Sequence, residues 1–185
     1  MSISLPIIVL ALSTEVFTVV YLNGFLREAG FTKVLISALT IAAIIAFLAG
    51  LGLIIGNEIN KLLINFSAIV STAILLVVGL KILLKSTKSK LHEMTWELTN
   101  FKVLASFSFA MGINSLLAGV ALAYAGAPSL KIVSLFFIIY FVIVLAGVIA
   151  GKLNNSFLLA VRTSFVGGIA LMATALFSFF YNPGN

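Results

Sequence analysis

Six apolar runs, each long enough to cross the hydrocarbon core of a bilayer, set the strongest limit on how this chain can fold. In the 185-residue sequence they lie at about residues 3–22, 34–56, 62–84, 103–125, 130–151 and 157–181. A spanning helix needs about 20 consecutive apolar residues. The runs lack the alternation of a barrel strand, and in lipid only helices and closed barrels satisfy every backbone group. We therefore predict an all-α polytopic membrane protein with six transmembrane helices.

Composition supports a protein whose main partner is the lipid bilayer. Hydrophobic residues make up 62% of the chain and charged residues 9%, against about 25% charged in soluble domains. The six runs leave no room for a soluble catalytic domain. The chain has no cysteine, which excludes disulfides and thiolate metal sites. In a membrane protein the net charge of +6 indicates orientation, so no nucleic-acid partner is predicted.

Basic residues gather at the first, third and fifth connections between the runs. These residues are Arg27, Lys33, Lys81, Lys85, Lys88, Lys90, Lys102, Lys152 and Arg162. The opposite side has only Lys61 and Lys131. Because lysine and arginine collect on the cytoplasmic side, we predict a cell-membrane protein with both termini outside the cytoplasm. Lys81 and Arg162 lie inside apolar runs near their cytoplasmic ends, and we expect both to extend toward the interface.

The two halves of the chain repeat the same pattern of glycines. Gly52 and Gly56 close the second run, and Gly147 and Gly151 close the fifth; each pair is followed by a short polar connection. Paired small residues of this spacing let helices approach closely, so these four glycines are predicted packing positions. The short connections also predict that consecutive helices pack antiparallel.

These features describe a single transmembrane domain over residues 1–185. Repeat one covers about residues 1–84, a cytoplasmic loop about 85–102, and repeat two about 103–181. Three helices per half is an odd number, so the two halves must be inverted relative to each other in the membrane. Secondary transporters often have this arrangement, with the substrate site between the repeats near the midplane.

Polar residues at matching depths mark the candidate site. Glu15 lies in the middle of the first run and Asn114 in the middle of the fourth. A charged side chain at that depth costs about 2.5–3.5 kcal/mol on insertion scales and usually serves a pathway or a site. We predict that Glu15 and Asn114 approach each other across the repeat axis. The structural alternatives are a neutral, hydrogen-bonded Glu15 and an Asn114 that only joins two helices.

Hydroxyl groups near these two residues are candidates to complete the site. Thr14 and Thr18 flank Glu15, and Ser115 follows Asn114. Oxygen ligands of this kind suit hard cations such as magnesium, manganese or alkali ions. Glu15 and Asn114 are therefore the predicted ligands of a transported cation, and no resident cofactor is predicted. The spans contain no nucleophile–base pair, metal triad or cofactor motif, so an enzyme is not predicted.

The chain resembles the MntP-type manganese efflux pumps of the LysE-like exporter superfamily over nearly its whole length. A Ser-x-Asp-Ala-type motif in the family's first helix, and a related one in its fourth, match residues 13–16 (Ser-Thr-Glu-Val) and 112–115 (Gly-Ile-Asn-Ser). Further family features match Gly50, Gly52, Gly147 and Gly151, the basic Lys81, and the glycine pair at 167–168. The resemblance implies a six-helix exporter of divalent cations.

The departures from the family concern its acids. The two intramembrane aspartates of the family correspond to Glu15 and Asn114, the chain has no aspartate, and an acid expected in the second helix falls near Ala43. A single carboxylate would leave a divalent ion under-neutralised in a site of low dielectric. The sequence therefore predicts cation efflux, with two alternatives: export of an amino acid or another small polar solute, and a membrane scaffold or complex subunit that retains the fold. It leaves the oligomeric state open.

Overall fold

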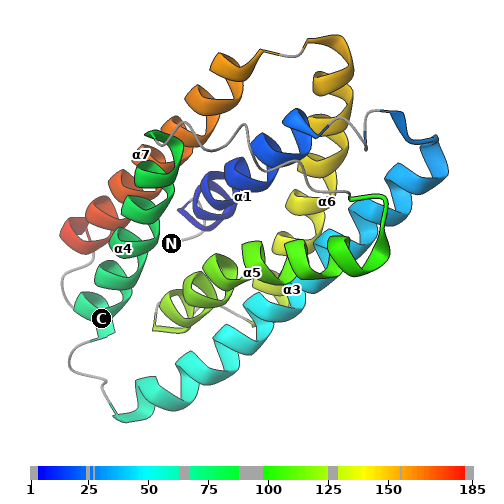
Figure 1. Ribbon diagram of the computed structural model, residues 1–185. Helices are drawn as coiled ribbons and strands as arrows, with labels where there is room; N and C mark the ends of the chain where they lie inside the picture. The colour runs from blue at the N-terminus through cyan, green and yellow to red at the C-terminus, as the bar shows by residue number, and fades with distance from the viewer. Residues whose placement is uncertain are drawn as a thin grey trace.

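Six α-helices make up the part of the chain that the computed structural model describes (Figure 1). The described residues are 4–23, 26, 28–62, 67–87, 98–124, 129–154 and 156–181. The helices are α1 (Ser4–Leu22), α3 (Phe31–Leu62), α4 (Ser67–Thr87), α5 (Phe101–Tyr124), α6 (Ser129–Leu153) and α7 (Phe157–Tyr181). All six are long and apolar enough to cross a membrane. The predicted all-α membrane class is confirmed, while Arg27, Lys88 and Lys90 of the predicted cytoplasmic connections lie outside the described residues.

Helix α3 is longer than the sequence predicts. Gly56 was expected to close this helix, but α3 continues to Leu62 and contains 32 residues. At a rise of 1.5 Å per residue the helix is about 48 Å long, which exceeds the hydrocarbon core of about 30 Å. The additional turns are polar, and an ion pair of 2.7 Å between Glu58 and Lys61 lies on their surface. A helix that leaves the bilayer needs no apolar surface, so hydropathy alone placed its end too early.

Packing between the halves dominates the fold. Helix α1 packs on α6 and α7, α5 packs on α3 and α4, and further contacts join α3 to α6 and α4 to α7. Helices joined by a short connection contact each other only weakly within the described ranges, so the predicted packing of such neighbours is wrong. Helices joined by a short connection diverge, and each buries its surface against the other half. A two-fold relation between the two halves would produce this pattern, in which the helices of each half pack mainly on helices of the other half.

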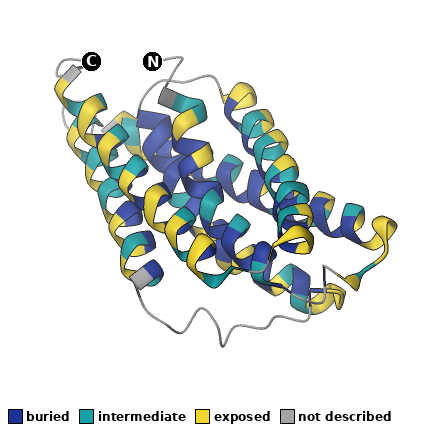
Figure 2. Ribbon diagram, turned by 90° about the horizontal axis from the view of Figure 1, so that it is seen from above, coloured by how far each residue is buried: buried dark blue, intermediate teal, exposed yellow. Residues whose placement is uncertain are grey.

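Helices α1 and α5 lie at the centre of the bundle. In the spanning parts of these helices 61% and 56% of the residues are buried, against 22% in α4 and 28% in α7. Exposed residues gather on the outer faces of the helices (Figure 2), and the large apolar side chains that are exposed include Phe47, Val77 and Phe177. The polar residues of the two central helices are therefore the ones that the fold shields from lipid.

Close contacts of glycines occur in both halves at corresponding places. A Cβ atom on Gly52 of α3 would overlap the backbone carbonyl of Leu116 in α5. A Cβ on Gly147 of α6 would lie 3.4 Å from the carbonyl oxygen of Phe17 in α1. Phe17 and Leu116 each lie two residues after the matched polar positions of their helices. The repeated contact supports the inverted arrangement, which itself stays a prediction.

We expect Gly52→Ala and Gly56→Ala to destabilise the protein, each by about 1–3 kcal/mol, the usual cost of overpacking. At Gly56 the added Cβ would lie 2.7 Å from the carbonyl oxygen of Val120, and two packed helices cannot both keep their positions. Thermal unfolding in detergent measures the effect. Gly30→Ala is the matched control, because nothing lies within 4 Å of a Cβ at Gly30. Equal unfolding temperatures for all three variants would contradict the close packing of α3 on α5.

Candidate functional site

Glu15 lies inside the bundle and joins the two halves of the chain. It belongs to α1, about 10 Å along the axis from the end of the helix at Leu22, and the residue is 5% exposed. Asn114 comes from the middle of α5 and is 4% exposed. Its side-chain nitrogen donates a hydrogen bond of 2.6 Å to Oε2 of Glu15. The two residues that the sequence pairs by position are thus in direct contact.

Two lysines of α4 also reach this pair. The Lys85 ammonium lies 2.6 Å from Oε1 of Glu15 and forms a salt bridge. The Lys81 ammonium donates a hydrogen bond of 2.7 Å to Oδ1 of Asn114. Lys85, Glu15, Asn114 and Lys81 therefore form one continuous polar chain across α4, α1 and α5, which we call the central cluster.

The direction of the lysines corrects the sequence-based expectation. Lys81 was expected to extend toward the membrane interface, yet its ammonium contacts a residue at the middle of α5. Lys85 lies in the last turn of α4 and also points inward. A carboxylate shielded from water attracts a cation much more strongly than one in water. The buried Glu15 therefore competes with the interface for both side chains.

The central cluster carries a net positive charge. Glu15 supplies one negative charge, and Lys81 and Lys85 supply two positive charges. The described part of the chain holds no group of three or more histidine, cysteine or acidic residues that could bind a metal. Both carboxylate oxygens of Glu15 are engaged in this arrangement, one by Lys85 and the other by Asn114.

The three predicted hydroxyl ligands bond elsewhere. Thr14 donates to the carbonyl oxygen of Ala11 at 2.7 Å, one turn back in its own helix. The Thr18 hydroxyl lies 2.9 Å from the carbonyl oxygen of Thr14 and 3.0 Å from that of Ala160 in α7. Both threonines therefore lie toward α7, away from α5. Helical spacing shows which residues share a face, but it does not show which neighbour that face meets.

Ser115 is buried next to Asn114 and bonds to α6. Its hydroxyl lies 3.0 Å from the hydroxyl of Tyr140, and both residues are at most 2% exposed. No hydrogen bond from Ser115 to Glu15 or Asn114 is present among the described contacts. The pair joins α5 to α6 close to the central cluster. The Ser115–Tyr140 pair is therefore a structural neighbour of the central cluster. The sequence did not indicate that Tyr140 would contact Ser115.

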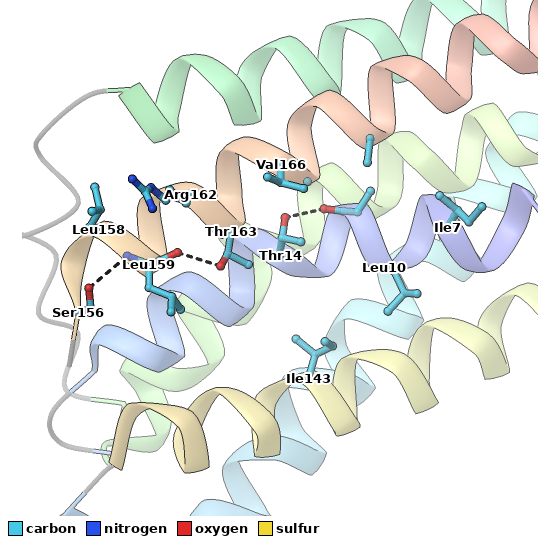
Figure 3. Close-up of a pocket in the computed structure, with 13 residues that line it drawn as sticks. Ile7, Leu10, Thr14, Ile143, Ser156, Leu158, Leu159, Arg162, Thr163 and Val166 are labelled. Atoms are coloured by element: carbon cyan, nitrogen blue, oxygen red, sulfur yellow. Dashed lines mark hydrogen bonds between the residues drawn. The ribbon is translucent and has the colours of Figure 1, made fainter. Parts of the chain in front are cut away.

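A groove on the other side of α1 contains Thr14. It has a volume of about 630 Å³ and lies between α1, α6 and α7. Figure 3 shows mostly apolar side chains around it, with Thr14 bonded to its own helix and Arg162 near the end of the groove. Glu15 and Asn114 are not among its lining residues. The groove is therefore distinct from the central cluster.

A second groove lies on the surface of α4 and includes both lysines of the central cluster. It has a volume of about 510 Å³ and is lined by Val77, Leu80, Lys81, Leu84 and Lys85 of α4. The side chain of Lys85 is 29% exposed, whereas that of Glu15 is 7% exposed. The two lysines therefore lie between this groove and the more deeply buried Glu15.

Comparison with protein families decides the identity of the chain. A family model described as "Mntp: Putative manganese efflux pump" matches residues 28–178, which is most of the sequence. The chain belongs to the MntP family. No curated protein and no solved structure matches it. Membership of the MntP family agrees with the six spanning helices and makes the chain a multi-pass membrane protein of a transporter family, which is consistent with a non-enzyme.

The matched region of the MntP family includes α5 and both lysines but begins after Glu15. The central cluster therefore combines residues inside the match (Asn114, Lys81 and Lys85) with one that precedes it. Sequence reasoning found Glu15 and Asn114 through their depth in the membrane. It missed the role of Lys85 as their partner, and the only available signal was its spacing of four residues from Lys81, which places both on one face of α4.

Proposed function

We propose that this chain exports a cation of the manganese-like divalent class, and that the cation binds at Glu15 and Asn114 during transport. The family supplies the class of transport. Glu15 supplies the charge, because it is the one acidic residue in the buried core of the described chain. The hydrogen bond between Glu15 and Asn114 supports a site between the halves, where secondary transporters bind their substrates.

One observation carries this proposal: a positively charged group, the ammonium of Lys85, already contacts the Glu15 carboxylate. The Lys85 ammonium is 2.6 Å from Oε1, so the carboxylate is placed to bind positive charge at this depth. The amide oxygen of Asn114 offers a second oxygen ligand once Lys81 withdraws. Hard cations prefer such oxygen ligands. A metal ion can enter only where one or both lysines leave.

Transport by reconstituted protein tests the proposal. Vesicles loaded with Mn²⁺, Mg²⁺ or Na⁺ are compared with protein-free vesicles of the same lipid, and ion efflux is followed over time. We expect protein-dependent efflux of at least one of these cations, with Mn²⁺ the first candidate. Absence of efflux for all three, with protein that is folded and correctly inserted, would contradict cation export.

Export of a zwitterionic solute such as an amino acid is the second candidate. Such a site must recognise a carboxylate and an ammonium at the same depth. The sequence shows no lysine at the depth of Glu15, but the side chains of Lys81 and Lys85 reach it. Together with Glu15 they provide both signs of charge. Efflux of radiolabelled amino acids from the same vesicles, with no cation efflux, would favour this candidate.

A scaffold that has kept the fold and lost transport is the remaining alternative. It predicts that neither class of solute moves, and that a variant of Glu15 has no effect on any flux. We further propose that both termini lie outside the cytoplasm, because of the distribution of lysine and arginine. Accessibility of a single cysteine introduced at residue 2 or 184 to a membrane-impermeant thiol reagent tests this orientation.

A further inference from the structure

We propose that Lys85 is a tethered cation that occupies the ion position on Glu15, so that a transported cation must displace the Lys85 ammonium to bind. This inference rests on the proposed function. It assigns to Lys85 the role of a specificity-determining residue. The sequence provided no such role, because a lysine in the last turn of a spanning helix is expected to face the interface.

The contacts of Lys85 are those of a bound cation. Its nitrogen lies 2.6 Å from the Glu15 carboxylate and 4.0 Å from the sulfur atom of Met111. No other acidic side chain is buried in the described core. A metal ion and the ammonium would therefore compete for the single negative charge of this carboxylate, because two cations side by side on it repel each other.

The surroundings of Lys85 also allow an alternative position for its side chain when the ammonium leaves Glu15. It lies in the last turn of α4, its side chain is 29% exposed, and it lines the groove of about 510 Å³ on the surface of α4. A long lysine side chain can carry its charge from this position to the membrane interface. Displacement therefore needs rotation of one side chain and leaves the helices in place.

Charge determines which ions exchange easily. Exchange of the ammonium for a monovalent cation leaves the charge of the central cluster unchanged, whereas exchange for a divalent cation adds one positive charge beside Lys81. Since such charge is costly in a medium of low dielectric, binding of a divalent ion requires Lys81 to withdraw as well as Lys85. Lys85 acts directly by occupying the carboxylate, and Lys81 acts through Asn114.

The lysines enter the central cluster from one half of the protein only. Both belong to α4. Helix α7 is the counterpart of α4 in the second half, and its only basic residue, Arg162, lines the groove between α1, α6 and α7. The central cluster is therefore asymmetric, with its tethered cation on the side of α4.

Mn²⁺ binding to the full-length protein in detergent tests this inference by calorimetry and by the ion-induced rise in unfolding temperature. If Lys85 holds the site for about nine-tenths of the time, the apparent affinity is lowered about tenfold. We expect Lys85→Met to raise Mn²⁺ affinity by about that factor and Lys85→Gln to raise it less. Lys85→Arg, which keeps the charge, should bind no more tightly than the parent.

Lys152→Met is the matched control, because Lys152 is an exposed lysine at the end of α6 and should leave Mn²⁺ binding as in the parent. Parent-like affinity in both Lys85→Met and Lys85→Gln would overturn the tethered-cation role and leave cation export standing. Absence of Mn²⁺ and Na⁺ binding in the parent and in every Lys85 variant would instead overturn the proposed cation site. If Lys85→Met does not fold, Lys85→Gln and Lys85→Arg still test the inference.

Discussion

Glu15→Gln should abolish cation binding and export while the protein remains folded. The substitution keeps the size of the side chain and a hydrogen bond with Asn114, but it removes the one buried acidic charge of the described core. We expect the affinity for Mn²⁺ to fall at least about a hundredfold, which corresponds to about 3 kcal/mol. Calorimetric titration and vesicle efflux measure the two effects separately.

The folded state should tolerate this change because Lys85 can leave. Removal of one partner from a fully buried ion pair costs about 3–5 kcal/mol, but the side chain of Lys85 is 29% exposed and lies in the last turn of α4. Its charge can move to the interface. Glu58→Gln is the control, because the side chain of Glu58 is 66% exposed and pairs with Lys61 at the end of α3. Normal transport by Glu15→Gln would exclude Glu15 as the ion ligand.

Asn114→Asp is expected to strengthen binding of divalent ions. It places a second carboxylate where the amide now contacts Oε2 of Glu15 at 2.6 Å. Two carboxylates neutralise a divalent ion, and manganese favours oxygen ligands of this kind. We expect Mn²⁺ affinity to rise by about tenfold or more, roughly 1.4 kcal/mol, with a much smaller change for Na⁺.

The comparison of the two ions provides the internal control for Asn114→Asp. A general change in stability or in access would affect Mn²⁺ and Na⁺ alike, whereas an added ligand charge acts mainly on the divalent ion. Equal affinity of the parent and the variant for Mn²⁺ would show that residue 114 is not a ligand. In that case Asn114 would serve only to join α5 to α1.

Much of the fold could be predicted from the sequence because a bilayer admits few kinds of backbone structure. Four of the six helices begin and end within two residues of the limits set by their apolar runs, since lipid requires long unbroken helices. The end of α3 was missed because its last turns are polar. The packing of each helix on the other half was also missed, since hydropathy shows which segments span the membrane but not which helices touch.

The candidate site was predictable in part. Glu15 and Asn114 are recognisable because a polar side chain at mid-depth needs a polar partner, and the structure brings them together. The positions of Thr14 and Thr18 depend on the rotation of α1 about its axis, which turns them toward α7. The inward direction of Lys85 depends on competition between the interface and a buried carboxylate, and that balance becomes visible only once α4 is placed beside α1 and α5.

Crystals of the protein grown with Mn²⁺ would test the central claim most directly, through anomalous diffraction at the manganese absorption edge. The parent and Lys85→Met should be compared. We predict an anomalous peak at about 2.1 Å from a Glu15 carboxylate oxygen, a distance usual for a small divalent ion on oxygen, with higher occupancy in Lys85→Met. Wherever the peak is present, the Lys85 ammonium of the parent should point away from Glu15. A peak elsewhere, or none near Glu15 in either protein, would contradict the account.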